Sequence, residues 1–560
     1  MSVAIADRQA TFCATFVDEL KASGVRHAVI CPGSRSTPLA LAAAEALEVF
    51  VRLDERSAGF FAQGLARATA TPVLIIVTSG TAAAELGPSV AEARFDTVPL
   101  IVATADRPPE LHGVGSPQTI IQRGIFGGHP RYETDPGLVH ELDEHEWRRL
   151  AHRLIVEATG AIPGPVHINL PFVEPLLGTP GELPPATELP RSVGVHPEMP
   201  VDEVTAGTGL IVAGGGIEDP ESFLNAARLL GWPVLADPRS GLRGRGRVVS
   251  AFDPILRADT QDLLRPDVVV LAGAPPASKV LGQKLEAWFA QGTQVVVANP
   301  EGRGRHPSRL PAVVFTSTPT EALRAIAAHH DALPDTQLIE WAELERLAQE
   351  MLTQLVGAGA SEPAVARRVA EVVGRERALV CSSSMPIRDL EWFGGDHGPA
   401  VVCNRGANGI DGVVSTAMGV AAAGQPTACL IGDLAFLHDV SALNDPPLGH
   451  ASLSVVVVDN RGGGIFSFLP QHDQLEKGRF EQLFGTPPSA SPAQVARGFG
   501  IETHEADSLE ELSAMLEDSM DRPGMRVLVV RVPEREDNLE VHRLFNEAIS
   551  DRIREQLAQR

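Results

Sequence analysis

An aspartate and an asparagine, 27 residues apart in the last third of the chain, each follow a short apolar run. Asp433 comes just after Thr427–Ile431, and Asn460 comes just after Leu453–Val458. Carboxylate and amide oxygens suit Mg²⁺, which takes few protein ligands and shares its coordination with substrate phosphates. The spacing, with a strand before each residue, favours a shared site over two ordinary Asp/Asn turns. We therefore predict that Asp433, Asn460 and one backbone carbonyl hold Mg²⁺ on a diphosphate.

Five basic side chains stand at or near the ends of other apolar runs. They are Arg35, Arg107, Lys279, Arg388 and Arg405. The chain has only four lysines, so a lysine just past a strand end is notable. An arginine fork pairs strongly with a carboxylate when water is excluded. Taken singly, each could also be a solvated loop residue, and the sequence leaves that alternative open.

Two turns in the first third add polar groups. Gly33 and Ser34 suit a tight turn into a helix, whose N-terminus attracts anions. Asp54-Glu55-Arg56 precedes an Ala/Gly-rich segment. Acids favour the first turn of a helix, so in isolation this cluster predicts a solvated helix start.

The elements that must position these residues are short runs of Val, Ile, Leu and Ala, for example Pro72–Val77, Val98–Ala103 and Val268–Ala272. Such runs indicate strands buried on both faces, and hence parallel sheets flanked by helices. Twelve or more runs are too many for one ordinary sheet, so we predict several consecutive α/β domains. Ligands in such folds sit beyond the carboxyl ends of the strands.

Two connectors divide the chain. Leu177–Pro200 is Pro-rich, and His329–Pro334 leads into a helical stretch. The predicted domains are therefore 1–180, 195–330 and 360–560.

Composition excludes several classes of protein. The 560 residues carry a formal charge of −24, which disfavours a nucleic-acid or anionic-membrane partner. No secretory signal is apparent, and no apolar stretch reaches the roughly 18 residues of a membrane span. The five cysteines include no C-x-x-C pair, which argues against a disulfide framework or a zinc site. We predict a cytoplasmic protein.

The motifs together resemble one family. Gly432-Asp433-Leu434 with Asn460 is similar to the thiamin-diphosphate motif, although family members often have Gly after the Asp and a pair of Asn residues. A wider set resembles the 2-succinyl-5-enolpyruvyl-6-hydroxy-3-cyclohexene-1-carboxylate synthases of menaquinone biosynthesis. The set comprises Pro32–Pro38, Asp54–Arg56, Thr78–Thr81, Ala105–Glu110, Asn404–Gly412 and Gly463–Phe466. The likeness runs from about residue 10 to 545 and is thin in the middle block.

The resemblance implies a thiamin-diphosphate-binding fold with pyrimidine-binding, central and diphosphate-binding domains in this order. It also implies a transferase of the carboligase type that uses Mg²⁺, with Mn²⁺ as a possible substitute. The reaction would decarboxylate 2-oxoglutarate and join the remainder to isochorismate by a conjugate, Stetter-like addition. The cofactor would lie between subunits, so the minimum unit would be a homodimer, with homotetramers also common.

The resemblance also assigns roles to residues. Glu55 would be catalytic, through a hydrogen bond to the aminopyrimidine ring of the cofactor, and the carbonyl of Gly462 would complete the metal site. Further cofactor contacts would be Thr78, Ser384, Met385, Gly432, Leu434, Ile465 and Phe466. Substrate would be held by Ser34, Arg35, Arg107, Gln118, Lys279, Ser384, Arg388 and Arg405. Within that set, Arg388 and Arg405 would take the succinyl side, and Arg35, Arg107 and Lys279 would take isochorismate.

One position departs from the family. Members often carry a second basic residue directly after the lysine, and here that position is Val280. Either Arg303 or Arg305 compensates, or fewer charges hold isochorismate, and the sequence leaves both alternatives open.

Three alternative functions compete with this one. Another thiamin-diphosphate carboligase, such as an acetolactate synthase relative, would share the Glu and metal motifs, but its acceptors are smaller and less charged. A non-catalytic cofactor-binding protein would not need Glu55, Asp433 and Asn460 intact. An NAD-dependent oxidoreductase would need G-x-G-x-x-G, and Gly214-Gly215-Gly216 lacks that spacing.

Overall fold

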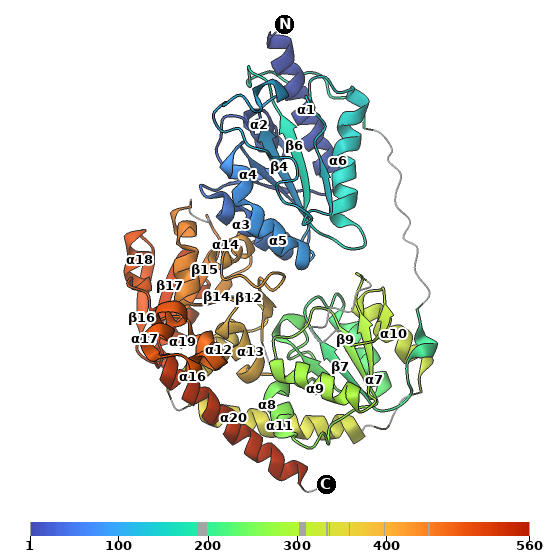
Figure 1. The fold of residues 1–560 in the computed structure, drawn as a ribbon, viewed down its shortest axis with the longest axis vertical. Coiled ribbons are helices and arrows are strands. Elements are labelled where there is room, and N and C mark those ends of the chain that lie inside the picture. Colours follow the sequence, from blue (N-terminus) through green and yellow to red (C-terminus); the bar gives the residue numbers. More distant parts are fainter. Residues whose placement is uncertain are drawn as a thin grey trace.

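The computed structural model describes residues 2–186, 199–301, 310–331, 334, 336–357, 359–396, 398–445 and 449–558. Three parallel sheets, each wrapped in helices, follow one another along the chain (Figure 1). The predicted fold class, three consecutive parallel-sheet α/β domains, is confirmed. The exact domain boundaries stay a prediction.

The first sheet has the order β2-β1-β3-β4-β6-β5. Its strands are β1 (His27–Ile30), β2 (Glu48–Val51), β3 (Val73–Val77), β4 (Leu100–Asp106), β5 (Tyr132–Thr134) and β6 (Val166–Pro171). Its helices are α1 (Ser2–Ala22), α2 (Thr37–Ala46), α3 (Glu55–Thr69), α4 (Thr81–Glu85), α5 (Gly87–Phe95) and α6 (Glu144–Thr159). Every residue of β3 is buried, as its continuous apolar run predicts.

The second sheet has the order β11-β10-β9-β7-β8. Its strands are β7 (Gly209–Ala213), β8 (Val234–Ala236), β9 (Val268–Ala272), β10 (Gln294–Ala298) and β11 (Val313–Phe315). Its helices are α7 (Pro220–Leu230), α8 (Phe252–Ala258), α9 (Lys279–Ala290) and α10 (Pro319–His329).

The third sheet has the order β13-β12-β14-β15-β17-β16. Its strands are β12 (Ala378–Cys381), β13 (Ala400–Val402), β14 (Thr427–Gly432), β15 (Ser452–Asp459), β16 (Glu502–Ala506) and β17 (Gly524–Arg531). The longer helices are α12 (Glu362–Val373), α13 (Met385–Phe393), α14 (Val413–Ala422), α19 (Leu509–Met520) and α20 (Arg535–Leu557). The shorter ones are α15 (Asp433–His438), α16 (Pro470–Gln474), α17 (Lys477–Phe480) and α18 (Pro492–Gly498).

The strand order reverses beside β1 in the first sheet and beside β12 in the third. In each case the next strand along the chain lies on one side, and β3 or β14 then returns to the other side. Loops leaving such a pair of strands diverge and open a crevice at the carboxyl edge of the sheet. Several polar motifs follow these strands: Gly33-Ser34 comes after β1, Thr78 after β3, Ser384 after β12 and Asp433 after β14.

The first and third domains pack against each other through α3 and α14 (Figure 1). Two glycines allow the close approach of the helices. A Cβ on Gly64 would lie 2.0 Å from the carbonyl oxygen of Thr416, and one on Gly419 would lie 2.0 Å from that of Phe61. Side chains of both domains therefore join one apolar core.

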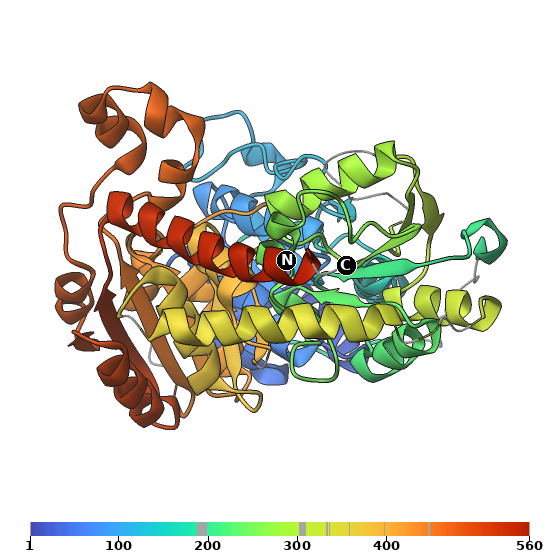
Figure 2. The same ribbon diagram turned by 90° about the horizontal axis from the view of Figure 1, so that it is seen from below.

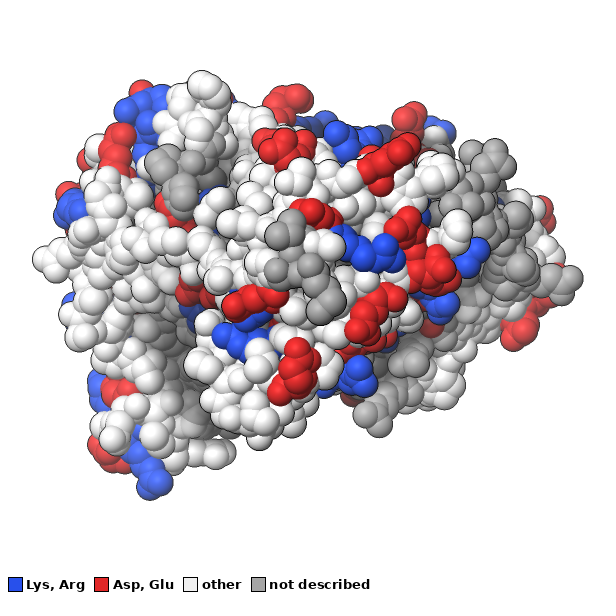
Figure 3. Space-filling view, turned by 90° about the horizontal axis from the view of Figure 1, so that it is seen from above, with Lys and Arg blue, Asp and Glu red and all other residues white. Residues whose placement is uncertain are grey.

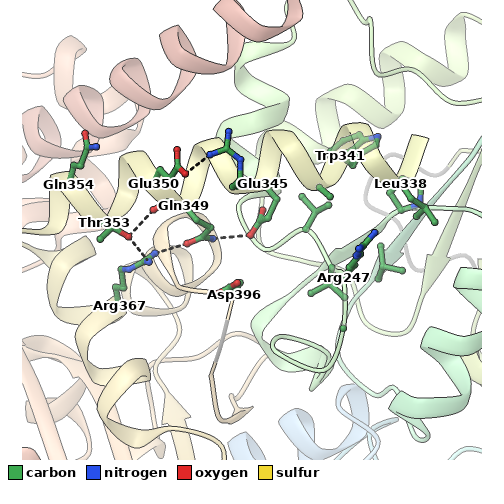
Figure 4. Close-up of a pocket in the computed structure, with 17 residues that line it drawn as sticks. Arg247, Leu338, Trp341, Glu345, Gln349, Glu350, Thr353, Gln354, Arg367 and Asp396 are labelled. Atoms are coloured by element: carbon green, nitrogen blue, oxygen red, sulfur yellow. Dashed lines mark hydrogen bonds and ion pairs between the residues drawn. The ribbon is translucent and has the colours of Figure 1, made fainter. Parts of the chain in front are cut away.

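Two long helices close the other side of the molecule. α11 (Thr336–Val356) and α20 run side by side beneath the second and third domains (Figure 2). A cavity of about 720 Å³ lies beside α11, and several of its polar side chains pair with one another, among them Arg346 with Glu350 and Gln349 with Glu345. Arg367 donates to Gln349 and Thr353, with Arg247 on the opposite wall (Figure 4). None of the predicted site residues lines this cavity.

The surface carries charges of both signs. On the face that Figure 3 shows, blue and red side chains are interspersed over white areas. In the described part of the chain, every helix is too short or too polar to span a bilayer. All five cysteines are free and buried. The cytoplasmic location stays a prediction.

Candidate active site

A cavity of about 150 Å³ lies beyond the carboxyl ends of β12, β14 and β15. Its lining contains most of the residues that the sequence suggests for the diphosphate and metal end of a cofactor. These are Ser384, Met385, Gly432, Asp433, Leu434, Asn460, Gly462, Ile465 and Phe466. The loops that carry them follow β12 and β14, where the sheet order reverses, and the neighbouring strand β15.

Asp433 is the first residue of α15, and its side chain is 1% exposed. Its Oδ1 accepts a hydrogen bond from the N–H of Leu434 at 2.7 Å. Its Oδ2 is buried and has no hydrogen-bond partner among the described residues. Burial raises the pKa of this carboxyl to about 7. An acceptor left unsatisfied in this way fits a cation that arrives with a ligand.

Asn460 follows β15 and is also buried. Its Oδ1 accepts a hydrogen bond from the N–H of Gly462 at 3.2 Å. The backbone that follows β15 therefore turns back to contact the Asn460 side chain. Gly462 has a φ of +132°, and a Cβ there would lie 2.2 Å from the carbonyl oxygen of Gly485. Only glycine fits this turn. The donor set and the space together fit a metal-bound diphosphate.

The N-terminus of α13 closes another side of the cavity. Ser384 precedes the helix with a φ of +75°, a conformation that non-glycine residues rarely adopt. Such strain tends to be kept at functional sites. The first residues of the helix, Met385 and Pro386, line the cavity. A helix N-terminus favours an anion, as expected beside a diphosphate.

Arg388 and Arg405 form a pair of cations beside this cavity. Arg388 Nη1 donates to the carbonyl oxygen of Ser384 at 2.5 Å. Burial, followed by the nearby charge of Arg405, lowers the pKa of Arg388. The Nε of Arg405 is buried without a partner, and neither guanidinium forms an ion pair with another described residue. Two such cations together favour an incoming carboxylate.

The first-domain residues gather at the other crevice, between β1 and β3. Gly33 lies against Thr78, where a Cβ would come within 2.2 Å of the Thr78 Cβ. Arg107 Nη1 donates to the Ser79 hydroxyl at 2.8 Å. Gln118 is exposed and lies against Gly80.

Two of the predicted substrate residues in this group differ in accessibility. Ser34 is exposed. Arg35 is buried and is held by its own chain, since it donates to the Phe172 carbonyl at 3.0 Å and to Glu174 at 2.9 Å. A role for Arg35 in binding substrate stays a prediction.

Glu55 begins α3, so the predicted helix start is confirmed, but its side chain is half-buried and not fully solvated as expected. Asp54 caps that helix by accepting from the N–H of Ser57 at 3.0 Å. The Glu55 side chain is half-buried, and burial raises its pKa. Glu55 does not line the cavity that contains Asp433. Within one chain, therefore, the described site residues form two separate groups.

Lys279 begins α9 in the second domain and is exposed. The N–H of Ala277 donates to Oε2 of Glu391 at 2.7 Å, which ties the Lys279 loop to the helix that carries Arg388. Val280 lines a cleft of about 770 Å³ between α9 and α20. Arg303 and Arg305, the alternatives for the missing second charge, lie outside the described residues.

Two buried acids in the cavity wall escaped the sequence analysis. Glu362 is 3% exposed and Asp389 is 2% exposed, and both line the cavity. Ser361-Glu362-Pro363 looks like an ordinary helix start, because Ser caps and Glu in the first turn are common there. Asp389 sits inside α13 with no motif around it. No signal in the sequence marks either residue as buried.

Comparison with known proteins gives consistent findings. Residues 10–125 match the model described as "Thiamine pyrophosphate enzyme, N-terminal TPP binding domain", and residues 399–530 match its C-terminal counterpart. Two curated relatives are named 2-succinyl-5-enolpyruvyl-6-hydroxy-3-cyclohexene-1-carboxylate synthase. That of Geobacillus kaustophilus is 38% identical over 97% of this chain and 98% of its own. That of Bacillus velezensis is 36% identical over 95% and 96%.

Solved structures share the fold. Benzoylformate decarboxylase from Polynucleobacter necessarius superposes with a TM-score of 0.72 at 16% identity, covering 93% of this chain and 98% of its own. A putative thiamin-diphosphate-dependent enzyme from Mycobacterium smegmatis gives 0.71 at 18% identity, covering 93% and 99%.

Proposed function

The chain belongs to the family of 2-succinyl-5-enolpyruvyl-6-hydroxy-3-cyclohexene-1-carboxylate synthases, and from that premise we propose a role for each group of site residues. The enzyme is a thiamin-diphosphate-dependent transferase of menaquinone biosynthesis. It decarboxylates 2-oxoglutarate and adds the remaining four-carbon unit to isochorismate. The curated relatives favour this reaction over that of an acetolactate synthase relative.

The observation that carries the cofactor assignment is the unpartnered Oδ2 of Asp433 in the cavity wall. We propose that Asp433, Asn460 and the carbonyl of Gly462 hold Mg²⁺, or Mn²⁺ in its place, on the diphosphate. Gly432, Leu434, Ser384 and Met385 would line the diphosphate. Ile465, Phe466 and, from the first domain, Thr78 would pack against the rest of the cofactor.

When bound, thiamin diphosphate supplies the electron sink that decarboxylation of a 2-oxoacid needs. The chain's own residues bind and orient the reactants. Glu55 would hydrogen-bond the ring nitrogen of the aminopyrimidine and hold a proton there. Its raised pKa, caused by burial, suits a group that shares a proton with a ring nitrogen.

Both substrates are dicarboxylates, and the site offers cations in two places. Arg388 and Arg405 stand next to the cavity, so we assign them to 2-oxoglutarate. Arg107, Arg35 and Lys279 would hold isochorismate, with hydrogen bonds from Ser34 and Gln118. Arg107 is already oriented by the Ser79 hydroxyl at 2.8 Å.

We propose that the working unit is a homodimer, or a tetramer built from such dimers. The support is the separation of Glu55 from the cavity of its own chain. A second copy would bring its first domain to that cavity and complete the site. Each two-fold pair would then contain two sites, each made from both chains.

Complementation between inactive chains tests this arrangement. Chains with Glu55→Gln and chains with Asp433→Asn should each be inactive alone. After subunit exchange, a mixed dimer contains one site with both native residues, so an equal mixture should recover about a quarter of wild-type activity. Mixed dimers that stay inactive would show that each site lies within one chain.

A further inference from the structure

A row of four buried polar side chains runs from the cavity wall into the third domain. Asn460 Nδ2 donates to Oε1 of Glu362 on α12. Glu362 in turn adjoins Asp389 on α13 and His542 on α20, and one potential ligand atom of each lies within 4.8 Å of the others. His542 Nε2 is 2.6 Å from Oδ1 of Asp389, and His542 Nδ1 is 2.8 Å from the carbonyl oxygen of Asn538.

The first hydrogen bond of the row decides which way the Asn460 amide faces. An amide carries a donor NH₂ on one corner and an acceptor oxygen on the other, whereas a carboxylate only accepts. The NH₂ group must therefore face Glu362. A flipped amide would set its oxygen against a carboxylate oxygen and leave both without a proton. The oxygen of Asn460 is thereby directed to the opposite side, where the N–H of Gly462 approaches it.

Backbone geometry protects this contact. Gly464 passes directly over it, and a Cβ there would lie 2.5 Å from Asn460 Nδ2 and 3.6 Å from Glu362 Oε1. A side chain at residue 464 would push the amide off the carboxylate. Little of the row is accessible to solvent: Glu362, which lines the cavity, is 3% exposed, and His542 is 1% exposed.

We propose that Glu362 is a positioning residue, which fixes the Asn460 amide so that its oxygen faces the catalytic cation, and that Asp389 and His542 hold Glu362 in place. The inference rests on the proposed function, because it takes Asn460 as a metal ligand. Partners that orient a ligand in this way are typically worth ten- to a hundredfold in metal affinity.

The hydrogen bonds of the same acids argue against a second metal site among Glu362, Asp389 and His542. Oε1 of Glu362 already accepts from Asn460, and Oδ1 of Asp389 is engaged with His542. These hydrogen bonds pair the ligand atoms with one another and with the amide. Asn460 is the proposed metal ligand of the row, so we expect the row to act on the cation through this residue.

The decisive experiment measures cation binding rather than turnover. Full-length protein is stripped of metal and saturated with thiamin diphosphate. Mn²⁺ is then titrated in, and the free ion is followed by electron paramagnetic resonance. Glu362→Gln should raise the Kd for Mn²⁺ ten- to a hundredfold, because an amide at this position accepts or donates with equal ease and no longer orients Asn460. The matched control is Glu371→Gln, an exposed acid of α12 paired with arginines, and it should leave the Kd unchanged.

A second substitution separates orientation from simple structural damage. Asn460→Asp alone sets a carboxylate against Glu362, so Mn²⁺ should bind more weakly than in the wild type despite the added ligand charge. Combined with Glu362→Gln, the same change should restore the Kd to within about threefold of wild type, since the new amide donates to the carboxylate and frees its other oxygen for the cation. Because Asn460→Asp is informative alone, the proposal stays testable if Glu362→Gln fails to fold.

The outcomes are distinguishable. A wild-type Kd in folded Glu362→Gln, or tighter binding in Asn460→Asp alone, would overturn the positioning role. If Asp433→Asn also left Mn²⁺ binding unchanged, the proposed cation site itself would be wrong. Loss of binding in Asp433→Asn with an unchanged Glu362→Gln would overturn only the present inference.

Discussion

Oδ1 of Asp445, in the third domain, accepts a hydrogen bond from the backbone N–H of Leu53 in the first domain at 3.0 Å, two residues before Glu55. Its Oδ2 accepts from the hydroxyl of Ser57 at 3.2 Å, two residues after Glu55. Arg52 Nε lies 3.5 Å from the same oxygen, and the Asp445 side chain is 1% exposed. Asp445 of the third domain thus fixes the chain on both sides of Glu55, the residue proposed to activate the cofactor.

Removing the Asp445 side chain should lower both kcat and the free energy of unfolding. Asp445→Ala leaves Arg52 buried without its partner, and breaking a buried pair in this way typically costs about 3–5 kcal/mol. The Glu55 loop should also loosen, so we expect kcat to fall at least about tenfold. Thermal unfolding and steady-state kinetics measure both effects. Asp445→Asn keeps an acceptor and should be milder on both counts, and wild-type kcat in folded Asp445→Ala would show that the loop needs no such support.

Glu55 is the residue proposed to share a proton with the ring nitrogen of the aminopyrimidine. Glu55→Gln should reduce kcat by at least about a hundredfold, in the range typical of a lost acid–base group, without changing the circular dichroism spectrum. Glu141→Gln, an exposed acid of the same domain outside the family motifs, is the control and should be neutral. Near-normal turnover in Glu55→Gln would remove the argument for cofactor activation.

The two cationic groups should separate the two substrates. Losing a charged hydrogen bond costs about 1.5–3 kcal/mol, so Arg388→Ala should raise the KM for 2-oxoglutarate more than the KM for isochorismate. Arg107→Ala should show the reverse order. Arg153→Ala removes an exposed ion pair on α6 and should change neither. If Arg388→Ala instead impaired isochorismate use more, the assignment of the pockets would be inverted.

Glu391 should make stability fall as pH rises. Its carboxyl is fully buried, and burial, followed by the charge of Asp237, raises its pKa to about 8. Between the ordinary glutamate value and pH 8, the unfolded chain has lost this proton and the folded chain still holds it. The unfolded state binds fewer protons there, so the free energy of unfolding decreases with rising pH.

Glu391→Gln should remove this dependence. The amide can still accept from the N–H of Ala277, but it cannot ionise. Denaturant unfolding at pH 6 and pH 8 should show a decrease in the wild type that is larger by about 2 kcal/mol than in the variant. Parallel pH profiles for the two proteins would mean that Glu391 does not titrate in this range.

Much of the fold could be predicted from the sequence, because a strand buried on both faces reads as an unbroken apolar run. β3 and β9 match such runs within one residue. Val98–Ala103 is placed too early, because β4 runs on to Asp106. Its polar end is buried in a network in which Thr104 donates to Asn169 at 2.9 Å, and the apolar pattern stops where that network begins.

The placement of Asp433 and Asn460 beside each other could equally be predicted from the sequence, while their metal-binding role stays a proposal. Asp433 and Asn460 follow neighbouring strands of one sheet, and parallel strands bring their carboxyl ends to one edge. Glu362 and Asp445 could not be predicted in this way, because each acts on a residue far away in sequence: Glu362 on Asn460, 98 positions on, and Asp445 on Leu53, 392 positions back. Contacts between residues so far apart in the chain produce no periodic or local pattern in the sequence.

Mass spectrometry of a single reaction mixture tests the central claim most directly. The mixture holds purified protein, thiamin diphosphate, Mg²⁺, 2-oxoglutarate and isochorismate, and parallel mixtures omit isochorismate or the cofactor. We predict 2-succinyl-5-enolpyruvyl-6-hydroxy-3-cyclohexene-1-carboxylate, with release of CO₂, only in the complete mixture. Folded, cofactor-loaded protein that forms no such adduct, yet couples 2-oxoglutarate or another 2-oxoacid to a different acceptor, would contradict the account.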